Sequence, residues 1–359
     1  MPENLMLDSG AFSVWSRGES IELDDYIKFC KSRPNMTVYI ALDVIPPKGA
    51  KLTSELKDKV ASEGWNNYLK MIRQVPMEKV MPVFHRGDSF KWLETMLDFE
   101  CPYIGLAPRF DGTDLKRKYK FIEDCKKYVY DSSGSPITKT HGLAVTNHKM
   151  MADFKWHSVD SATWVQTAGW GGILVPPFEN GQWNFKKQPF RVLCSVVASK
   201  RQDASHHVLA MREQRPQLFE IVSKWLSDNG IGLGKHTVED ANGRKPKNVV
   251  ERWEDRAKTK ILRIEERGVT NCDRVRKWIN GVYFHRVNDA LSIKNIYLAG
   301  SGTTPAIENQ MRCRLRSFVD ELHTTDWLYR RIGQWEQPFE FPSDVYKGDG
   351  VPSFSFKEN

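Results

Sequence analysis

A strand–helix–strand pattern lies in residues 79–107, which read KVMPVFHRGDSFKWLETMLDFECPYIGLA. Residues 79–85 and 103–107 are mostly apolar and contain β-branched or aromatic side chains, as buried strands do. Residues 90–99 between them have the apolar spacing of a helix. Two strands joined through a helix lie parallel in one sheet, connected by a right-handed crossover. This stretch therefore predicts an α/β fold.

The same alternation extends to both sides of this unit. Further strands are expected at residues 5–12, 37–45, 140–145 and 156–160, and helices at 21–31, 53–73, 114–130 and 149–154. Six strands in about 160 residues fit a (β/α)8 barrel of the TIM type better than an open sheet. A dinucleotide-binding fold is disfavoured, because no Gly-x-Gly-x-x-Gly follows the first strand.

The second half of the chain has a less regular pattern. It predicts a seventh strand at 191–197, helices at 206–228, 249–267 and 273–288, a last strand at 295–300 and a helix at 306–322. We therefore expect three parts. Residues 1–198 form the main part of a catalytic barrel, residues 199–292 a helical basic insertion before the last strand, and residues 293–359 the last strand, the closing helix and a C-terminal tail.

The 359-residue chain has a net charge of +8 and a pI of about 9.0. Residues 199–277 hold 18 Lys and Arg against 12 Asp and Glu, so +6 of this charge lies there. This distribution favours a polyanionic partner such as nucleic acid, with Arg244, Lys245 and Lys247 as candidate phosphate contacts. The alternative is a solvated face whose charge only maintains solubility.

Membrane and metal-binding classes are disfavoured. No apolar run is long enough to span a bilayer, and the first residues lack the pattern of a signal peptide, so a cytoplasmic protein is expected. Six scattered cysteines form no Cys-x-x-Cys pair or zinc-type cluster. We expect free, buried thiols in a reducing compartment and neither a metal nor another cofactor.

Polar residues stand where the expected strands end. In a parallel barrel the catalytic groups lie at the carboxyl ends of the strands. These ends carry Asp8-Ser9-Gly10, Asp43, His85-Arg86-Gly87, Gly105-Leu106, His141-Gly142-Leu143-Ala144 and Asp160. Each aspartate alone could equally cap a helix or begin a turn. Three aspartates at matching strand ends indicate a site, and the adjacent glycines suggest that the backbone approaches a ligand closely.

These segments resemble the tRNA-guanine transglycosylase superfamily over roughly the first 165 residues. The resemblance rests on six motifs in order: Asp8-Ser9-Gly10-Ala11-Phe12-Ser13, Ala41-Leu42-Asp43, Val83-Phe84-His85-Arg86-Gly87, Tyr103-Ile104-Gly105-Leu106-Ala107, His141-Gly142-Leu143-Ala144 and Val159-Asp160. The first motif and Ser158-Val159-Asp160-Ser161-Ala162-Thr163-Trp164 look most like the DpdA-type enzymes of phages and bacteria, which replace guanine in DNA with a 7-deazaguanine derivative.

The chain departs from the superfamily in three respects. The tRNA enzymes carry a Cys-x-Cys-x-x-Cys and His zinc site that has no match here. His85 stands where the superfamily has a glutamine, so recognition of the base carbonyl can differ. The segment after Asp160 has no counterpart that aligns.

The resemblance implies base exchange at C1′ by two carboxylates. By analogy with retaining glycosidases, Asp160 would be the nucleophile and Asp8 the general acid and base. Asp43 would accept hydrogen bonds from guanine N1–H and the 2-amino group. His85 and the amides near Gly105 and Leu106 would hold the 6-oxo edge. Lining the pocket would be Ser9, His141, Gly142 and Leu143.

The expected partners are DNA and a free 7-deazaguanine base, with no cofactor. The compact length and the missing zinc region favour a monomer, in the host cytoplasm if a phage encodes it. Three alternatives stay open: a transglycosylase acting on tRNA, a non-catalytic nucleic-acid-binding subunit on the same fold, and an unrelated barrel hydrolase acting on a sugar or nucleoside.

Overall fold

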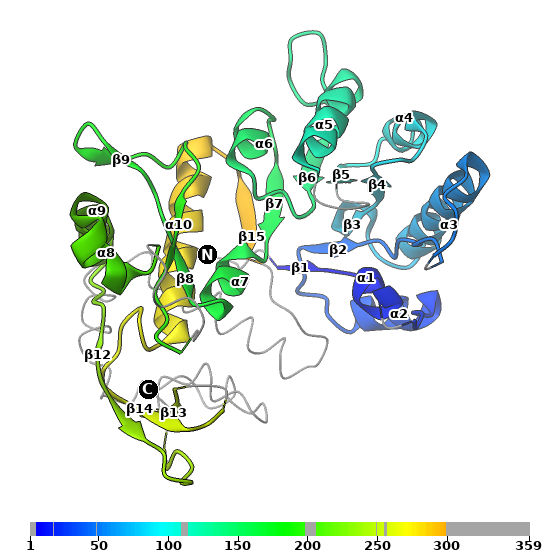
Figure 1. The fold of residues 1–359 in the computed structure, drawn as a ribbon. Coiled ribbons are helices and arrows are strands. Elements are labelled where there is room, and N and C mark those ends of the chain that lie inside the picture. The colour runs from blue at the N-terminus through cyan, green and yellow to red at the C-terminus, as the bar shows by residue number, and fades with distance from the viewer. Residues whose placement is uncertain are drawn as a thin grey trace. The chain divides into compact units, whose positions relative to one another are not determined.

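The computed structural model describes residues 5–16, 18–47, 49–108, 114–197, 206–248, 250–254 and 257–298. Its contacts divide the chain into two compact units (Figure 1). Unit 1 comprises Met1–Ser161 and Leu291–Tyr297, and unit 2 comprises Ala162–Ala290 and Leu298–Asn359. The first unit therefore ends directly after the expected catalytic Asp160, well before the boundary predicted at residue 198.

Unit 1 is built on parallel strands whose order in the sheet follows the chain. One sheet has the order β1-β2-β3 and the other β15-β7-β6-β5-β4. The strands are β1 (Met6–Leu7), β2 (Val38–Ile40), β3 (Val80–Met81), β4 (Val83–His85), β5 (Tyr103–Ala107), β6 (Lys139–Gly142), β7 (Ser158–Ser161) and β15 (Asn295–Leu298). The pairings β1–β2, β2–β3, β4–β5, β5–β6 and β6–β7 are all parallel.

Pro82 is the point at which β3 changes into β4. Proline has no N–H to donate, so it interrupts a ladder of backbone hydrogen bonds. Its carbonyl still accepts a hydrogen bond from the Gly105 N–H at 2.8 Å. This hydrogen bond, together with the chain itself, connects the two sheets of unit 1 at Pro82. Among the described residues, β1 and β15 do not pair, so a closed ring of strands is not shown.

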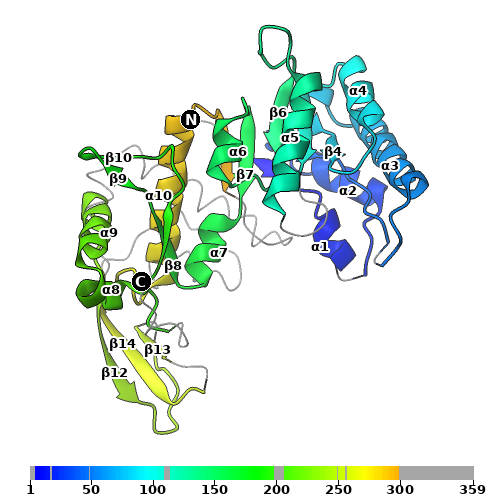
Figure 2. The ribbon, with the colours of Figure 1, turned by 45° about the horizontal axis from the view of Figure 1, so that its top comes forward.

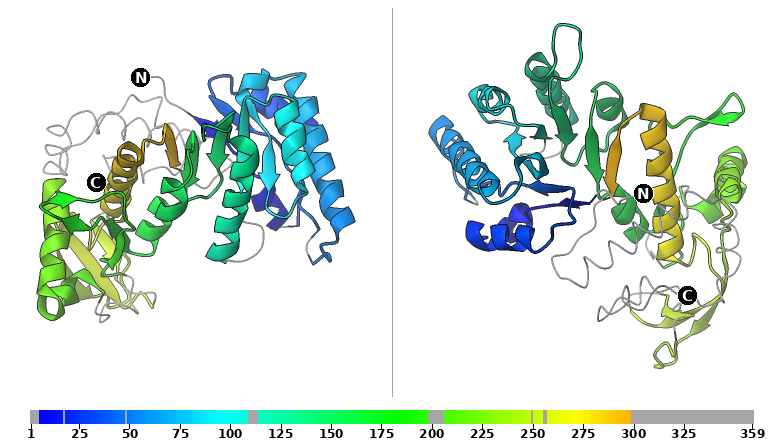
Figure 3. Two further views of the ribbon diagram at one scale, coloured as in Figure 1. Left: turned by 90° about the horizontal axis from the view of Figure 1, so that it is seen from above. Right: turned by 180° about the vertical axis from the view of Figure 1, so that it is seen from behind.

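Helices connect these strands and lie outside them, as the arc from α2 to α6 shows (Figure 1) and as the right view of Figure 3 repeats from behind. They are α1 (Ala11–Ser16), α2 (Leu23–Lys31), α3 (Ser54–Ile72), α4 (Phe90–Asp98), α5 (Leu115–Val129) and α6 (His148–Ala152), with a 3₁₀ turn at Met77–Lys79. The side chain of Asp114 caps α5 by accepting from the N–H of Lys116 at 3.0 Å. The α/β class with parallel strands and intervening helices is thus confirmed.

The strands of unit 1 have two different faces, because successive side chains point to opposite sides. Phe84 points to the helices, where its ring lies 5.3 Å from that of Phe90. On the other face, Val38, Ile40, Met81 and Tyr103 form a buried apolar cluster with Met6, Val83 and Leu143 packed against it. This inner cluster is an apolar layer next to the polar residues at the strand ends.

Unit 2 is arranged around the long helix α10 (Asp273–Leu291) (Figure 2). The buried amide of Asn280 accepts from the Leu174 N–H at 2.8 Å and donates to the Trp164 carbonyl at 3.1 Å. Its other elements are α7 (Thr163–Gly169), β8 (Gly172–Val175), β9 (Phe178–Glu179), β10 (Gln182–Trp183), β11 (Phe190–Leu193), α8 (Val208–Gln214), α9 (Pro216–Asp228), β12 (Lys235–Asp240), β13 (Glu251–Trp253) and β14 (Lys260–Glu266).

Two predictions for the second half were wrong. The expected seventh barrel strand is β11, which pairs antiparallel with β8 inside unit 2. The expected helix at 249–267 is instead β13 and β14, which form an antiparallel sheet in the order β12-β14-β13. Alternation of buried and exposed residues along β14 has a period near two, which suits a strand with one covered face. The basic insertion is therefore not purely helical.

Other predictions held or fall outside the described residues. The helix at 273–288 is confirmed by α10, whereas the single helix expected at 206–228 is divided at Arg215 into α8 and α9, because Pro216 begins a new helix. The helix expected at 306–322 and the C-terminal tail lie outside the described residues. Five cysteines are buried and free, namely Cys30, Cys101, Cys125, Cys194 and Cys272, and Cys313 lies outside. Within the described ranges, no helix is both long and apolar enough to cross a bilayer.

Candidate active site

Polar side chains stand at the carboxyl ends of the unit 1 strands, on the inner face. Asp8 follows the inner residue Met6 by two positions, and His85 follows Val83 in the same way. A spacing of two keeps both members of each pair on one face of a strand. Parallel pairing brings the carboxyl ends to one edge of the sheet. Asp8, His85 and Asp160 therefore lie at the same edge of the sheet, as predicted.

The surroundings of the Asp8 carboxyl group favour its protonated form. Its pKa is raised to about 6, chiefly by the loss of surrounding water and then by the negative charges of Asp43 and Asp160. Backbone hydrogen bonds from Gly10 and Ser9 oppose the rise. The Asp8 side chain nevertheless stays exposed on one side. It is therefore accessible to a ligand and partly protonated near neutral pH.

Asp43 is the centre of a hydrogen-bonded chain. Its Oδ1 accepts from Ser9 Oγ at 3.2 Å, and its Oδ2 lies 3.0 Å from His85 Nε2. The other ring nitrogen of His85 lies 3.8 Å from Asp88 Oδ2. Burial alone would raise the pKa of Asp43, but the hydrogen bond and charge of His85, with the bond from Ser9, bring it below its ordinary value. Burial would lower the pKa of His85, but Asp43 and Asp88 raise it overall.

Asp160 is oriented through one of its two oxygens. Its Oδ1 accepts from the N–H of Ala144 at 2.5 Å. Ala144 has a φ of 53°, a left-handed conformation that is rare for a residue with a side chain. Such strain is found where the surroundings demand one backbone geometry, often at functional sites. Among the described residues Oδ2 has no hydrogen-bond partner, which leaves it open for chemistry.

A chain of buried polar groups lies below Asp160. The completely buried His141 has its Nδ1 2.5 Å from Ser158 Oγ, and this hydroxyl also bonds to the Tyr103 hydroxyl. His141 Nε2 lies 3.4 Å from Asp160 Oδ1, near the limit of a hydrogen bond and without the alignment for one. The imidazole thus stands between a hydroxyl pair and the carboxylate.

Donation along this chain can run in either direction, from Tyr103 to His141 or from His141 to Tyr103. Each hydroxyl has a single proton to donate. If Tyr103 donates to Ser158, the Ser158 proton is available for Nδ1 of His141, which then acts as an acceptor. The proton of the neutral imidazole is then on Nε2, facing Asp160. The arrangement favours an N–H directed at the carboxylate and assigns His141 a positioning role.

The glycines at two strand ends make room for protein rather than for a ligand. A Cβ at Gly105 would lie 2.8 Å from Leu143 Cδ1, and one at Gly142 would lie 2.8 Å from Val145 Cγ2. The expectation that these glycines allow a ligand to approach is corrected accordingly. The Gly105 N–H is also already bonded to Pro82. It is therefore not available to hold a base carbonyl.

Other predicted residues occupy different places. Leu106 is completely buried, and its carbonyl accepts from the Leu143 N–H at 3.0 Å. Leu143 packs on the inner cluster. His141 is too deeply buried to line a pocket in this conformation. Among the predicted ligand-binding side chains, the structure brings Ser9, Asp43 and His85 together at the site.

Sequence reasoning missed three members of the site. Asp88, three residues after His85, also accepts from its backbone N–H at 3.2 Å. Its position in the same strand-end loop was the available signal. Ser158 could have been found because it lies two residues before Asp160 and therefore on the same face. Tyr103 offered no signal, since an aromatic residue is ordinary in a buried strand.

The predicted phosphate contacts lie in unit 2. Arg244 is already paired there, with its guanidinium 2.7 Å from Glu239 Oε2 and 3.1 Å from Glu251 Oε2. The side chains of Lys245 and Lys247 are exposed. Arg244 therefore serves to hold its own loop, and the two lysines are the exposed cations among the three predicted contacts.

Comparison with known proteins gives no independent assignment. No protein-family model, curated protein or solved structure matches this chain significantly. Among the described residues, no cluster of three or more His, Cys, Asp or Glu has the arrangement of a metal site.

Proposed function

We propose that this protein is a base-exchange transglycosylase that replaces guanine in DNA with a 7-deazaguanine derivative through a glycosyl-aspartate intermediate. The observation that carries the proposal is the difference between two carboxylates at one strand edge. Asp8 is partly protonated, and Asp160 presents an oxygen with no partner among the described residues. Carboxylates whose environments differ in this way are typical of an acid and a nucleophile working together. The motif resemblance of the same segments supports this pairing.

The proposed reaction has two displacements at C1′. In the first, Asp160 Oδ2 forms a bond to C1′ while the bond from C1′ to the guanine nitrogen breaks, and Asp8 gives its proton to the departing base. In the second, the incoming base loses a proton to Asp8 and its ring nitrogen displaces Asp160. The configuration is retained, and both carboxyl groups return to their starting states.

Asp43 is proposed to read the guanine edge. Each of its oxygens accepts one hydrogen bond in the structure, and a carboxylate oxygen can accept two. Asp43 therefore keeps capacity for N1–H and the 2-amino group. His85 faces Asp43 and Asp88 and is proposed to keep Asp43 ionised, in place of the earlier expectation that it holds the 6-oxo group.

The finer architecture proposed is a (β/α)8 barrel. Three observations support it: chain-order parallel strands, helices on their outer side, and an apolar inner cluster. Closure of the ring between β15 and β1 is the part of this proposal that the described strand pairings do not include. In such a barrel the polar strand ends are the expected location of catalysis.

DNA is favoured as the substrate over tRNA by the resemblance to DpdA-type enzymes and by the missing zinc motif. A target base in duplex DNA must leave the stack before C1′ can be attacked, at a cost of a few kcal/mol. Lys245 and Lys247 are proposed to contact phosphates. Neutralising both should reduce the slope of log K against log salt by about two if each contacts one phosphate. An unchanged slope would remove them from the interface.

Base exchange is tested with radiolabelled guanine and separate samples of duplex DNA, single-stranded DNA and bulk tRNA. The wild type is compared with Asp160→Ala and with Asp153→Asn, a surface carboxylate whose loss should not matter. Label that enters DNA only, and only with an intact Asp160, supports the proposal. Label in tRNA only would keep the mechanism and change the polymer. No label in any polymer would favour a binding subunit or a hydrolase, and free-nucleoside hydrolysis would identify the latter.

A further inference from the structure

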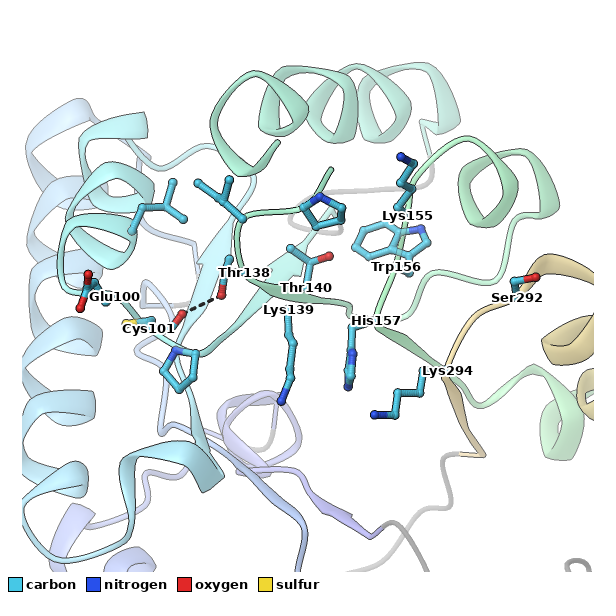
Figure 4. A pocket seen from close by; sticks show the side chains of 14 residues that line it. Glu100, Cys101, Thr138, Lys139, Thr140, Lys155, Trp156, His157, Ser292 and Lys294 are labelled. Atoms are coloured by element: carbon cyan, nitrogen blue, oxygen red, sulfur yellow. Dashed lines mark hydrogen bonds between the residues drawn. The ribbon is translucent and has the colours of Figure 1, made fainter. Parts of the chain in front are cut away.

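A second polar pocket lies in unit 1 at the opposite ends of the strands from Asp160. It has a volume of about 800 Å³ and lies where β5, β6, β7 and β15 begin. Figure 4 shows its lining, which is Leu97, Glu100, Cys101, Pro102, Pro136, Ile137, Thr138, Lys139, Thr140, Lys155, Trp156, His157, Ser292 and Lys294. The volume is within the usual range for small-molecule sites. The proposed base exchange does not use it.

One side of this pocket is positively charged. Lys139 and the His157 ring extend side by side in the same direction, and Lys294 extends toward them from the other side of His157 (Figure 4). Burial, followed by the charges of Lys139 and Lys294, lowers the pKa of His157 to about 4. Neither lysine has an ion-pair or hydrogen-bond partner among the described residues. Two lysines that lie beside one imidazole and have no paired carboxylate among the described residues create a positive potential that favours binding of an anion.

The lining of the pocket also includes a buried hydroxyl. Thr140 lines the pocket, is completely buried, and its Oγ1 has no hydrogen-bond partner in the described part of the chain. Buried polar groups without a partner are uncommon, because the loss of water costs free energy that a hydrogen bond would return. Thr140 follows Lys139 in β6, so its side chain points to the opposite face of the strand from Lys139, as Figure 4 shows. Lys155 is different, because its Nζ already donates to the Gly134 carbonyl at 2.6 Å.

The far side of the pocket limits the kind of anion. Glu100 lies across the pocket from Lys294 (Figure 4). A carboxylate there would repel a continuous polyanion but can accept hydrogen bonds from hydroxyl groups. A ligand with one phosphate at the lysines and hydroxyl groups toward Glu100 suits both sides. We propose that this pocket binds a phosphate ester of a small hydroxylated molecule, such as a sugar phosphate or a nucleotide, with the phosphate between Lys139 and Lys294.

The test is titration calorimetry of the full chain with ribose 5-phosphate, uridine 5′-monophosphate, inorganic phosphate and ribose. A pyrimidine nucleotide is chosen because it does not present a guanine edge to Asp43. The esters should bind at least about tenfold more tightly than ribose, and more tightly than inorganic phosphate. Binding should weaken at least about tenfold in Lys139→Gln/Lys294→Gln.

The matched control is Lys31→Gln/Lys70→Gln, which removes the same charge from exposed helical positions of unit 1. It should bind the esters within about twofold of the wild type. In NMR, the titration midpoint of His157 should rise when an ester is bound, because the added anion offsets the lysine charges. Unchanged thermal unfolding midpoints would show that the lysine variants are folded.

Three results would overturn the proposal: no ester binds, the two double variants weaken binding equally, or inorganic phosphate binds as tightly as the esters. Binding of a DNA oligonucleotide through these lysines, with no binding of the esters, would make the surface a nucleic-acid contact instead. Base exchange is not measured in this test. Its outcome is therefore separate from the success or failure of the proposed transglycosylase activity.

Discussion

His141 Nε2 lies 3.4 Å from Asp160 Oδ1, although the histidine is completely buried and the aspartate is partly open to solvent. The histidine therefore contacts the carboxylate from the buried side, and in the proposed reaction it would not touch the substrate. Behind it, Ser158 links Nδ1 to the Tyr103 hydroxyl. These buried hydrogen bonds hold the His141 ring beside Oδ1 of Asp160.

Ser158→Ala tests this relationship. Removal of the hydroxyl leaves the buried Nδ1 and the Tyr103 hydroxyl without their partner, so the free energy of unfolding should fall by about 1–3 kcal/mol. We expect kcat to fall about 10- to 100-fold with little change in KM. Nitrogen NMR should show the Nε2–H tautomer of His141 in the wild type and a mixture in the variant. Ser20→Ala, at an exposed site, is the control. An unchanged tautomer would contradict the positioning role.

Asp8→Asn tests the acid. Because the pKa of Asp8 is raised to about 6, its protonated form declines above that pH. In the wild type, kcat/KM for the nucleic acid should decrease with a midpoint near pH 6 and about tenfold per further pH unit. The variant cannot transfer a proton, so its rate should be about 10²- to 10⁴-fold lower and should lack this limb. A limb that persists in Asp8→Asn would assign it to another group.

Asp160→Asn tests the covalent step. A denaturing gel of a quenched reaction should show labelled DNA attached to the wild-type protein and none attached to the variant. Exchange should fall at least about 10³-fold, because an amide is a poor nucleophile. Asp153→Asn should retain both the adduct and the exchange. An adduct of normal yield in Asp160→Asn would identify a different nucleophile.

His85→Gln tests the ion pair with Asp43 through pH. The pKa of His85 is raised above 6.5, so its contribution to stability is complete below 6.5 and is lost as pH rises through the higher value. The pKa of Asp43 is lowered below 3.8, so its contribution is present above 3.8 and is lost as pH falls through the lower value.

The stability difference between wild type and His85→Gln should therefore be largest between about pH 4 and 6.5, at about 1–2 kcal/mol for this partly buried pair. It should shrink as the pH is raised further. Denaturant unfolding at a series of pH values measures it, with the exposed His206→Gln as the control. A difference that does not vary with pH would show that His85 contributes by packing alone.

Gly105→Ala tests the close packing at the strand end. The new Cβ would lie 2.8 Å from Leu143 Cδ1 and 3.3 Å from Val83 Cγ2. Overpacking of this kind should lower the free energy of unfolding by about 1–3 kcal/mol. Adding Leu143→Val should recover part of the loss, because it removes the side-chain atom nearest the new Cβ. Failure of the second change to recover stability would locate the strain elsewhere.

The local sequence predicted the order of strands and helices in the first unit. Apolar strands, periodic helices and Pro or Gly boundaries are short-range properties, so the α/β order of residues 79–107 and the positions of Asp8 and Asp160 at the carboxyl ends of strands could be predicted. The period of two along a strand also places Asp8, His85 and Asp160 on one face. The prediction failed for β13 and β14, where a short pattern did not distinguish a helix from a half-covered strand.

Only the tertiary structure decided which polar groups meet. The contacts of Asp43 with Ser9 and His85 join residues 34 and 42 positions apart, and no local pattern encodes such pairs. It also decided that Gly105 makes room for Leu143, and that Lys139, His157 and Lys294 share one pocket. Burial, charge proximity and the pKa of Asp8 depend on distances through space. Residue types along the chain therefore predicted the chemistry available, and packing determined which residues are placed to perform it.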